Sequence, residues 1–176
     1  MKTEDHNIKL QLEHYKMKIT RQNILFSRAP SRPEHACEPI EEINGIVFIN
    51  DSGSTSIHKT IQSILEFSKP IILITGGKDE SSDYSYLSEL PAELFKQVIY
   101  LGENSTKIMR QFVKISGVEF HHFPGDLEKS VKHALENGKE GELVLFSPGC
   151  PSFDVFDNFK NRGNKFKEIV KSLKVE

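Results

Sequence analysis

Short apolar runs rich in β-branched residues alternate with amphipathic stretches from Asn44 onward, and this alternation constrains the fold more than any other feature. The runs, which we predict to be strands, cover residues 45–50, 70–75, 97–101, 118–123 and 142–146. The first, second and last are almost entirely apolar, as expected for strands that are covered on both faces. Strands that alternate with helices predict an open α/β domain of Rossmann-like type, with a mostly parallel sheet and helices on both faces.

Apolar residues at helical spacing fill the stretches between these runs. Helices are predicted after Ser54 or Ser56, after Asn104-Ser105 and after Asp126, because these residue types cap helix N-termini. The last predicted helix has an apolar face made of Phe156, Phe159, Phe166, Ile169 and Val170.

Small and polar residues follow most of the predicted strands. In open parallel sheets, ligands bind outside the carboxyl ends of the strands. The segments expected there are 50–53, 76–79, 102–104 and 147–150. They predict a ligand site at this edge, but turns between strands and helices use the same residue types. Both interpretations stand at this point.

Length and charge restrict the class of protein. A chain of 176 residues predicts one domain at residues 35–176, preceded at residues 1–34 by an arm whose structure the sequence leaves open. The formal net charge of −2 argues against a nucleic-acid partner or an anionic membrane. No apolar run approaches the roughly 20 residues that span a bilayer, and the N-terminus is too polar for a signal peptide. We expect a cytoplasmic protein.

Several single residues have both a chemical and a structural interpretation. Asp51 could accept hydrogen bonds from ribose hydroxyls or could cap the next helix. Cys150 follows a strand, where a nucleophile could lie, but no motif pairs it with a histidine, and a structural thiol is favoured. His121 and His122 would point to opposite faces of a strand, so we assign them no metal. The chain has no Walker P-loop.

One long pattern identifies a relative. The stretch "SPGCPSFDVFDNFKNRGNKF", with "GIVFINDS" and "ITGGKDESSDYSYL" before it, resembles the C-terminal domain of the Mur ligases, in particular the branch that adds D-glutamate to a peptidoglycan precursor. The resemblance covers about residues 35–173. The matching positions are Ser147, Pro148, Cys150, Ser152, Phe153, Asp154, Phe156, Asn158, Phe159, Arg162, Gly163 and Phe166.

The resemblance implies specific roles. In those ligases the C-terminal domain closes over a central ATPase domain, and ATP converts a carboxylate to an acyl phosphate that the incoming amino group attacks. The residues that match the amino-acid contacts are Thr55, Ser152, Phe153 and Phe159, and His35 and Asp51 match positions near the adenine and ribose. Hydroxyl groups and helix N-terminal amides suit a carboxylate ligand such as a small acidic amino acid.

Three departures from the family pattern remove cations. Ala36 replaces an arginine that would touch phosphate, Gly53 replaces a lysine near the reacting phosphates, and Glu80 replaces a lysine that would hold the amino acid's carboxylate. Lys78 lies two residues earlier and is the candidate substitute. Phosphoryl transfer needs cations against developing negative charge. The segments that match the ATPase and UDP-binding domains are also absent from this sequence.

We therefore expect an accessory or ligand-binding module that has no activity by itself and holds no cofactor, with ATP and Mg²⁺ entering only if a central ligase domain completes it. One alternative is a C-terminal fragment or subunit of a working D-glutamate ligase. The other is a protein-interaction module on a degenerate ligase fold. No catalytic residue and no metal ligand are assigned.

Overall fold

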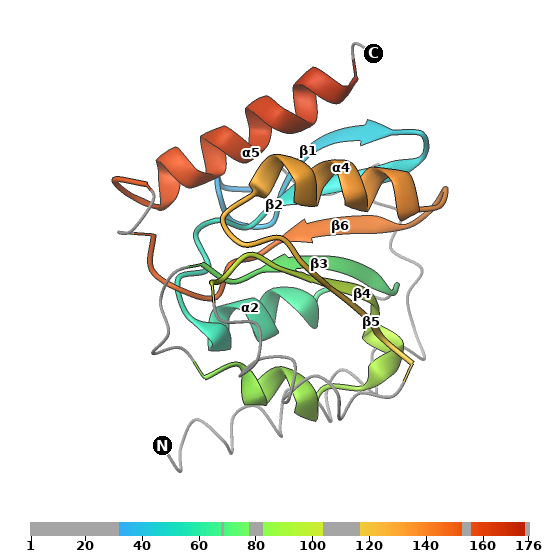
Figure 1. Ribbon diagram of the computed structural model, residues 1–176, viewed down its shortest axis with the longest axis vertical. Coiled ribbons are helices and arrows are strands. Elements are labelled where there is room, and N and C mark those ends of the chain that lie inside the picture. The colour runs from blue at the N-terminus through green and yellow to red at the C-terminus, as the bar shows by residue number, and fades with distance from the viewer. Residues whose placement is uncertain (1–31, 68, 78–82, 104–116, 153–155, 175–176) are drawn as a thin grey trace.

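The computed structural model describes residues 32–67, 69–77, 83–103, 117–152 and 156–174. Residues 1–31 and the helix predicted after Asn104-Ser105 lie outside this range. The described strands form a six-stranded sheet in the order β1-β2-β6-β3-β4-β5 (Figure 1). Only β1 runs antiparallel to its neighbour. The strands are β1 (Glu38–Ile43), β2 (Ile46–Asn50), β3 (Ile71–Thr75), β4 (Phe95–Tyr100), β5 (Glu119–His122) and β6 (Leu143–Phe146).

All five predicted strands are present, with ends shifted by one or two residues, whereas β1 was not predicted. The β1–β2 connection is the pair Asn44-Gly45, with φ angles of 53° and 76°. Two positive φ values in a two-residue loop define the hairpin turn that joins twisted antiparallel strands. Pro39 fits β1 because this strand lies at the sheet edge and its register shifts after Pro39.

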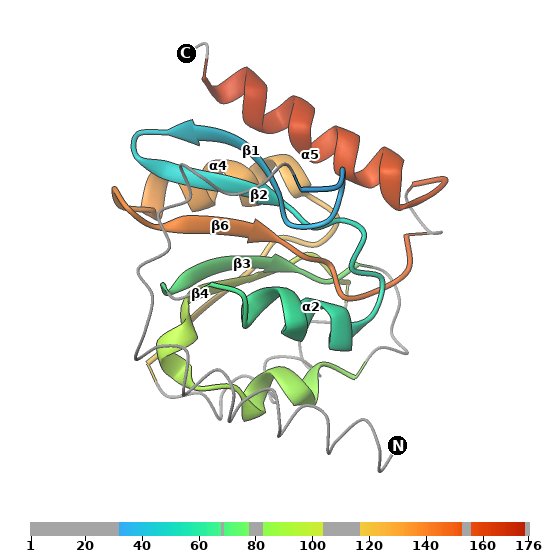
Figure 2. The same cartoon turned by 180° about the vertical axis from the view of Figure 1, so that it is seen from behind.

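Helices cover both faces of the sheet, which confirms the Rossmann-like α/β prediction (Figures 1 and 2). Helix α2 (Ile57–Ile64) and the short 3₁₀ helices η2 (Tyr84–Glu89) and η3 (Ala92–Leu94) lie on one face. Helices α4 (Leu127–Asn137) and α5 (Phe159–Leu173) lie on the other. Among the described residues, no helix is both long and apolar enough to cross a membrane.

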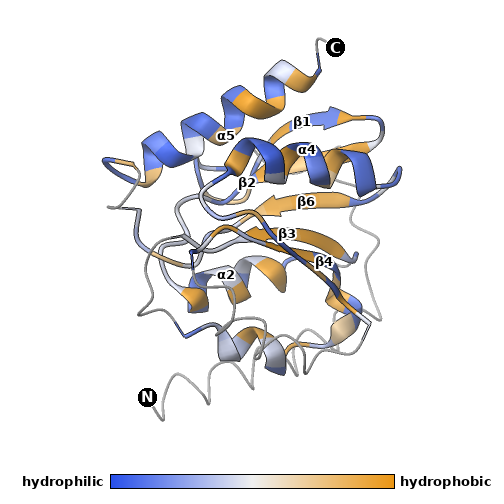
Figure 3. Ribbon diagram, in the orientation of Figure 1, coloured by the Kyte–Doolittle hydropathy of each residue, from blue (hydrophilic) through white to orange (hydrophobic). Residues whose placement is uncertain are grey.

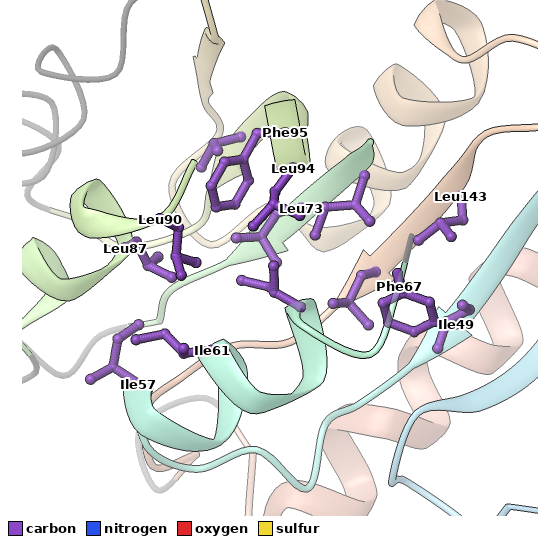
Figure 4. Packing of buried hydrophobic residues seen from close by; sticks show 14 of the residues in the cluster. Ile49, Ile57, Ile61, Phe67, Leu73, Leu87, Leu90, Leu94, Phe95 and Leu143 are labelled. Atoms are coloured by element: carbon purple, nitrogen blue, oxygen red, sulfur yellow. The ribbon is translucent and has the colours of Figure 1, made fainter. Parts of the chain in front are cut away.

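Two apolar layers hold the helices on the sheet, because successive strand residues point to opposite faces. Ile49, Leu73 and Leu145 face the α2 side and are fully buried, as Figure 4 shows for the first two. Phe48 and Val144, one residue earlier in their strands, face α4 and α5. The hydropathy colouring agrees, because the inner strands β6 and β3 are apolar and the helices carry polar residues between their apolar ones (Figure 3).

Side-chain caps set where two helices begin. Asp126 accepts a hydrogen bond from the backbone N–H of Lys129 at 2.9 Å, as predicted. Asn158 caps α5 by accepting from the amides of Lys160 and Asn161. This cap starts α5 at Phe159, so the predicted place of Phe156 on the helical face is wrong; Phe156 precedes the helix and is only half-buried. Ser56 is the N-cap residue of α2 but makes no side-chain cap.

Candidate functional site

The carboxyl ends of the parallel strands meet at one rim of the sheet. Asn50 pairs with Phe146, Thr75 with Tyr100, and Tyr100 with His122. This register places the turns after β2, β3, β4 and β6 side by side, as the sequence predicted for the part of these turns that the structure describes. Those parts are residues 50–53, 76–77, 102–103 and 147–152.

Asp51 is a buried link between three strands. Its side chain accepts a hydrogen bond from the backbone N–H of Cys37 at 3.1 Å through Oδ1 and from the hydroxyl of Ser147 at 2.7 Å through Oδ2. Its own N–H donates to the carbonyl of Phe146. The residue is 3% exposed. Both carboxylate oxygens of Asp51 are therefore committed to holding the ends of β2 and β6 and the start of β1 together.

Arg162 fastens α5 to two of the rim turns. Its Nη1 donates to the carbonyls of Cys150 and Pro151 at 3.1 and 3.2 Å, and its Nη2 donates to the carbonyl of Ser52 at 3.0 Å. The side chain is buried. The next residue, Gly163, lies so close to the turn that a Cβ atom there would come within 2.1 Å of the Ser52 hydroxyl. The Arg-Gly pair of the sequence pattern is thus structural in this protein.

His35 is a buried histidine in an unusual backbone conformation, with φ of 66°. Its Nδ1 lies 3.1 Å from Asn50 Nδ2 and 3.0 Å from the Ser52 hydroxyl. The Asn50 Oδ1 atom accepts from the Ser52 amide, which orients the Asn50 NH₂ group toward the ring. We therefore assign Nδ1 as the acceptor and the proton to Nε2.

The charge on His35 follows from its surroundings. Burial lowers the pKa of His35, and the nearby positive charge of Lys167 lowers it further. The ring is therefore neutral near pH 7. The His35 and Phe159 rings also form a nearly perpendicular pair, with a centroid distance of 5.9 Å and an interplanar angle of 87°. His35 is held from two sides, by the β2 turn and by the start of α5.

A surface hollow of about 550 Å³ opens beside this cluster. The loop from Arg32 to Cys37, the turn after β2, the outer side of α2 and Phe159 line it. Its described lining has two permanent cations, Arg32 and Lys59, and Arg32 is bonded to Glu66. This hollow brings together His35, Asp51 and Phe159, three of the residues predicted from the resemblance.

The other predicted residues lie around the hollow or outside the described range. Thr55 is half-buried in the segment before α2, and Ser152 is buried in the connection from β6 to α5. Neither lines the hollow. Phe153 and Lys78, together with Glu80, lie outside the described residues.

Most charged groups that line the hollow already bind other groups of the protein. Both oxygens of Asp51 are already bonded, and one of the two lining cations is paired. Within the described ranges, no three acidic, histidine or cysteine side chains converge to hold a metal. At Gly53, a Cβ atom would lie 2.7 Å from the His35 carbonyl, so a lysine at this position would displace the loop.

Both cysteines are free thiols and are buried. Burial, followed by the nearby charge of Asp51, raises the pKa of Cys37 to about 12, so this thiol is neutral. Cys150 is fully buried, and its carbonyl and sulfur lie near Arg162 Nη1. The favoured interpretation of Cys150 as a structural thiol agrees with this burial.

Sequence reasoning missed the roles of Glu38 and Arg162. Glu38 lies on β1 and accepts from the His35 amide and from Asn50 Nδ2. The Asn-Gly pair at 44–45 is a hairpin signal that could have revealed β1 and its glutamate. No local signal could have revealed the partners of Arg162, because they lie on turns about 11 and 110 residues away.

Comparison with known proteins assigns the relationship. The chain is 39% identical over 140 residues to a protein of Caldicellulosiruptor saccharolyticus and 36% identical over 144 residues to one of Clostridium tetani; each match covers 80% of this chain and 31% of the relative. This protein is therefore a homologue of the Mur ligases. Both relatives carry the name UDP-N-acetylmuramoylalanine–D-glutamate ligase, so the homology is to the D-glutamate-adding branch. No family model matches the chain.

Solved structures of Mur ligases are also similar. A MurF ligase of Thermotoga maritima in complex with ADP matches with a TM-score of 0.48 and 16% identity, over 82% of this chain and 33% of that chain. MurC of the same organism, named a UDP-N-acetylmuramate-alanine ligase, matches with a TM-score of 0.48 and 15% identity, over 82% and 31%. This chain spans about a third of the length of the curated relatives that it matches.

Proposed function

We propose that this chain is a module derived from the amino-acid-presenting C-terminal domain of a D-glutamate-adding Mur ligase, and that it does not form an amide bond by itself. The observation that carries the proposal is the packing of Gly53. Its N–H donates to the His35 carbonyl at 2.8 Å, and the same carbonyl occupies the space that a side chain would need. The resembling ligases have a lysine at this position. Here the backbone around Gly53 leaves no room for a lysine side chain.

The charge distribution of the hollow supports the same proposal. Ala36 is exposed where the family pattern has an arginine, so nothing at this position offsets a phosphate charge. Asp51 accepts hydrogen bonds from Cys37 and Ser147, and Arg162 donates to the carbonyls of Cys150, Pro151 and Ser52. The motif residues that remain therefore maintain the rim turns rather than binding phosphates, and ATP and Mg²⁺ would have to come with a separate central domain.

The amino-acid pocket is the part in which we propose residual binding. Thr55, Ser152, Phe153 and Phe159 are the proposed contacts with a small acidic amino acid, with Lys78 as the proposed substitute for the missing lysine. Glu80 opposes such a ligand because like charges repel by on the order of 1–4 kcal/mol near a protein surface. D-Glutamate is therefore expected to bind weakly, and Glu80→Lys is expected to tighten binding in titration calorimetry. Wild-type binding that is tight and survives Lys78→Ala would contradict this charge argument.

The direct test has two stages. First, the purified chain is assayed for ATP hydrolysis and for joining D-glutamate to UDP-N-acetylmuramoylalanine with ATP and Mg²⁺, and no turnover above a protein-free control is expected. Second, the chain is added to the C. saccharolyticus relative from which the homologous third has been deleted. We expect no ligation in this mixture either, since Gly53 and Ala36 supply no cation.

Restored ligation in the mixture would support the second candidate, a subunit of a working ligase, and would overturn the proposed inactivity. The intact rim favours this candidate, because Ser147, Arg162 and Gly163 hold the turns in a single ordered arrangement. Replacing the wild-type chain in the mixture by the Ser152→Ala variant would then show whether the restored ligation depends on the amino-acid pocket. Asn164→Ala, at an exposed position on α5, is the control.

A further inference from the structure

A pair of histidines lies at the opposite edge of the sheet from the hollow. His121 is on β5, the last strand of the sheet, and His133 is on α4. Their ring centroids are 4.1 Å apart with an interplanar angle of 52°. Neither residue belongs to the ligase-like sequence pattern.

Both rings contain a buried nitrogen without a hydrogen bond. In the described part of the chain, the Nε2 atoms of His121 and His133 have no hydrogen-bond partner. A buried polar atom in this state costs free energy, and burying it charged costs much more. The pair therefore tolerates two neutral rings better than two charged ones.

Charged groups lie near the pair on both β5 and α4. On β5, the Glu119 carboxylate oxygen Oε2 lies 3.5 Å from His121 Nε2. On α4, Glu136 and Lys129 act on His133 with opposite signs. Phe123 packs against His133 at a centroid distance of 5.2 Å, and Lys129 Nζ lies 4.8 Å above the Phe123 ring.

His133 also has a neighbour that favours its neutral form. Asn137 Nδ2 lies 3.4 Å from His133 Nδ1, while it donates to the His133 carbonyl at 2.9 Å. An NH₂ group facing Nδ1 requires an acceptor there, and protonation would turn that acceptor into a second donor. Charging His133 therefore opposes both the His121 contact and the Asn137 contact.

A metal ion does not explain the pair. Two imidazoles that bind one tetrahedral ion at about 2.0–2.1 Å each hold their ring centres roughly 5 Å apart, farther than the 4.1 Å found here. Among the described residues, no third ligand completes such a group. The rings pack on each other instead.

We propose that His121 and His133 form a proton-sensitive contact that holds α4 to the edge strand β5 near neutral pH and loosens it in mild acid. Burial, followed by the charge of His121, lowers the pKa of His133 below its usual value of 6.5. The unfolded or detached segment thus binds a proton at a higher pH than the packed one does. The stabilisation is complete above pH 6.5 and decreases as the pH falls below it.

Hydrogen exchange tests this contact on the full chain. Amide protection of peptides that cover 119–123 and 127–137 is compared at pH 7.5 and 5.5, after correction for the intrinsic exchange rates. One proton changes an opening equilibrium at most about tenfold per pH unit, so we expect a roughly three- to tenfold loss of protection in both segments. The buried strands β3 and β6 should lose less.

Substitutions distinguish a loss of protection caused by this pair from one caused by acid elsewhere in the protein. His133→Gln and His121→Gln should each remove most of the loss, while His58→Gln, an imidazole on α2, should leave it intact. Unchanged protection in wild type, or a loss that persists in both pair variants, would overturn the proposal. If the variants fail to fold, nuclear magnetic resonance titration of wild-type imidazoles decides: a His133 midpoint at or above 6.5 contradicts the proposal, and a lower midpoint supports it.

Discussion

Buried polar groups at the β2–β6 rim and at the β5 edge of the sheet differ in how many hydrogen bonds they make. At the β2–β6 rim, Asp51 has a donor on each carboxylate oxygen, and Arg162 reaches three carbonyls. At the β5 edge, His121 and His133 bury Nε2 atoms that make no hydrogen bond in the described structure. A polar network in which more of the hydrogen bonds are made holds its groups more firmly in one arrangement. The difference indicates a rigid rim and an adjustable edge.

Gly163→Ala should show the largest effect on this comparison. The added Cβ would meet the Ser52 hydroxyl and His35 Nδ1 at 2.1 and 2.3 Å, so the rim would have to open. We expect a loss of about 3 kcal/mol in the free energy of unfolding, measured by urea denaturation. Asn164→Ala, an exposed neighbour on α5, should change it by less than about 0.5 kcal/mol. Equal effects for the two would mean that the rim is not rigid.

Ser147→Ala tests the rim by removing one donor. The Ser147 hydroxyl lies 2.7 Å from Asp51 Oδ2 and 2.8 Å from Thr60 Oγ1, and all three residues are buried. Removing it leaves a carboxylate oxygen without its donor, and we expect a loss of about 1–3 kcal/mol in a denaturation experiment. Ser172→Ala is the control, because its hydroxyl bonds only the preceding turn of α5 at an exposed position. A loss no larger than that of the control would contradict the rim network.

His133→Leu should have the smallest effect at neutral pH. The substitution removes the contacts of His133 with Asn137 and with the His121 ring. It also removes a buried nitrogen that makes no hydrogen bond and keeps an apolar contact with Phe123, so the gain offsets much of the loss. At pH 7.5 we expect a change of less than about 1 kcal/mol in the free energy of unfolding. A loss as large as that of Ser147→Ala would show that the edge is as tightly specified as the rim.

Lys167→Met tests how much a partly exposed set of ion pairs beside the rim contributes to stability. Lys167 bonds Glu34 and Glu38, which flank the His35 loop. Hydrogen bonds to these two carboxylates outweigh the burial that disfavours its charge, and the pKa of Lys167 is raised. Since these charges are partly solvated, we expect a small decrease in the unfolding midpoint that disappears in high salt. Lys165→Met, on the exposed side of α5, is the control, and a loss that high salt does not reduce would contradict an ionic origin.

Local patterns predicted most of the fold because they depend on residues that are neighbours in sequence. The apolar runs around Ile49, Leu73 and Leu145 correctly predicted strands, and Asp126 correctly predicted where α4 begins. The same kind of reasoning placed Phe156 on the final helix, where the Asn158 cap excludes it. It also overlooked β1, whose signal is a two-residue turn.

The sequence by itself determined the order of strands and helices, the rim at which polar turns gather and the ancestry carried by the segment from Ser147 to Phe166. Only the tertiary structure decided what those polar residues do. Asp51, Ser147 and Arg162 are equally suitable as ligand contacts and as scaffold in a linear pattern, and their partners come from strands far apart in the chain. The contact between His121 and His133 likewise exists only because α4 packs beside β5. Hydrogen-bond partners depend on strand register and helix placement, which no local spacing specifies.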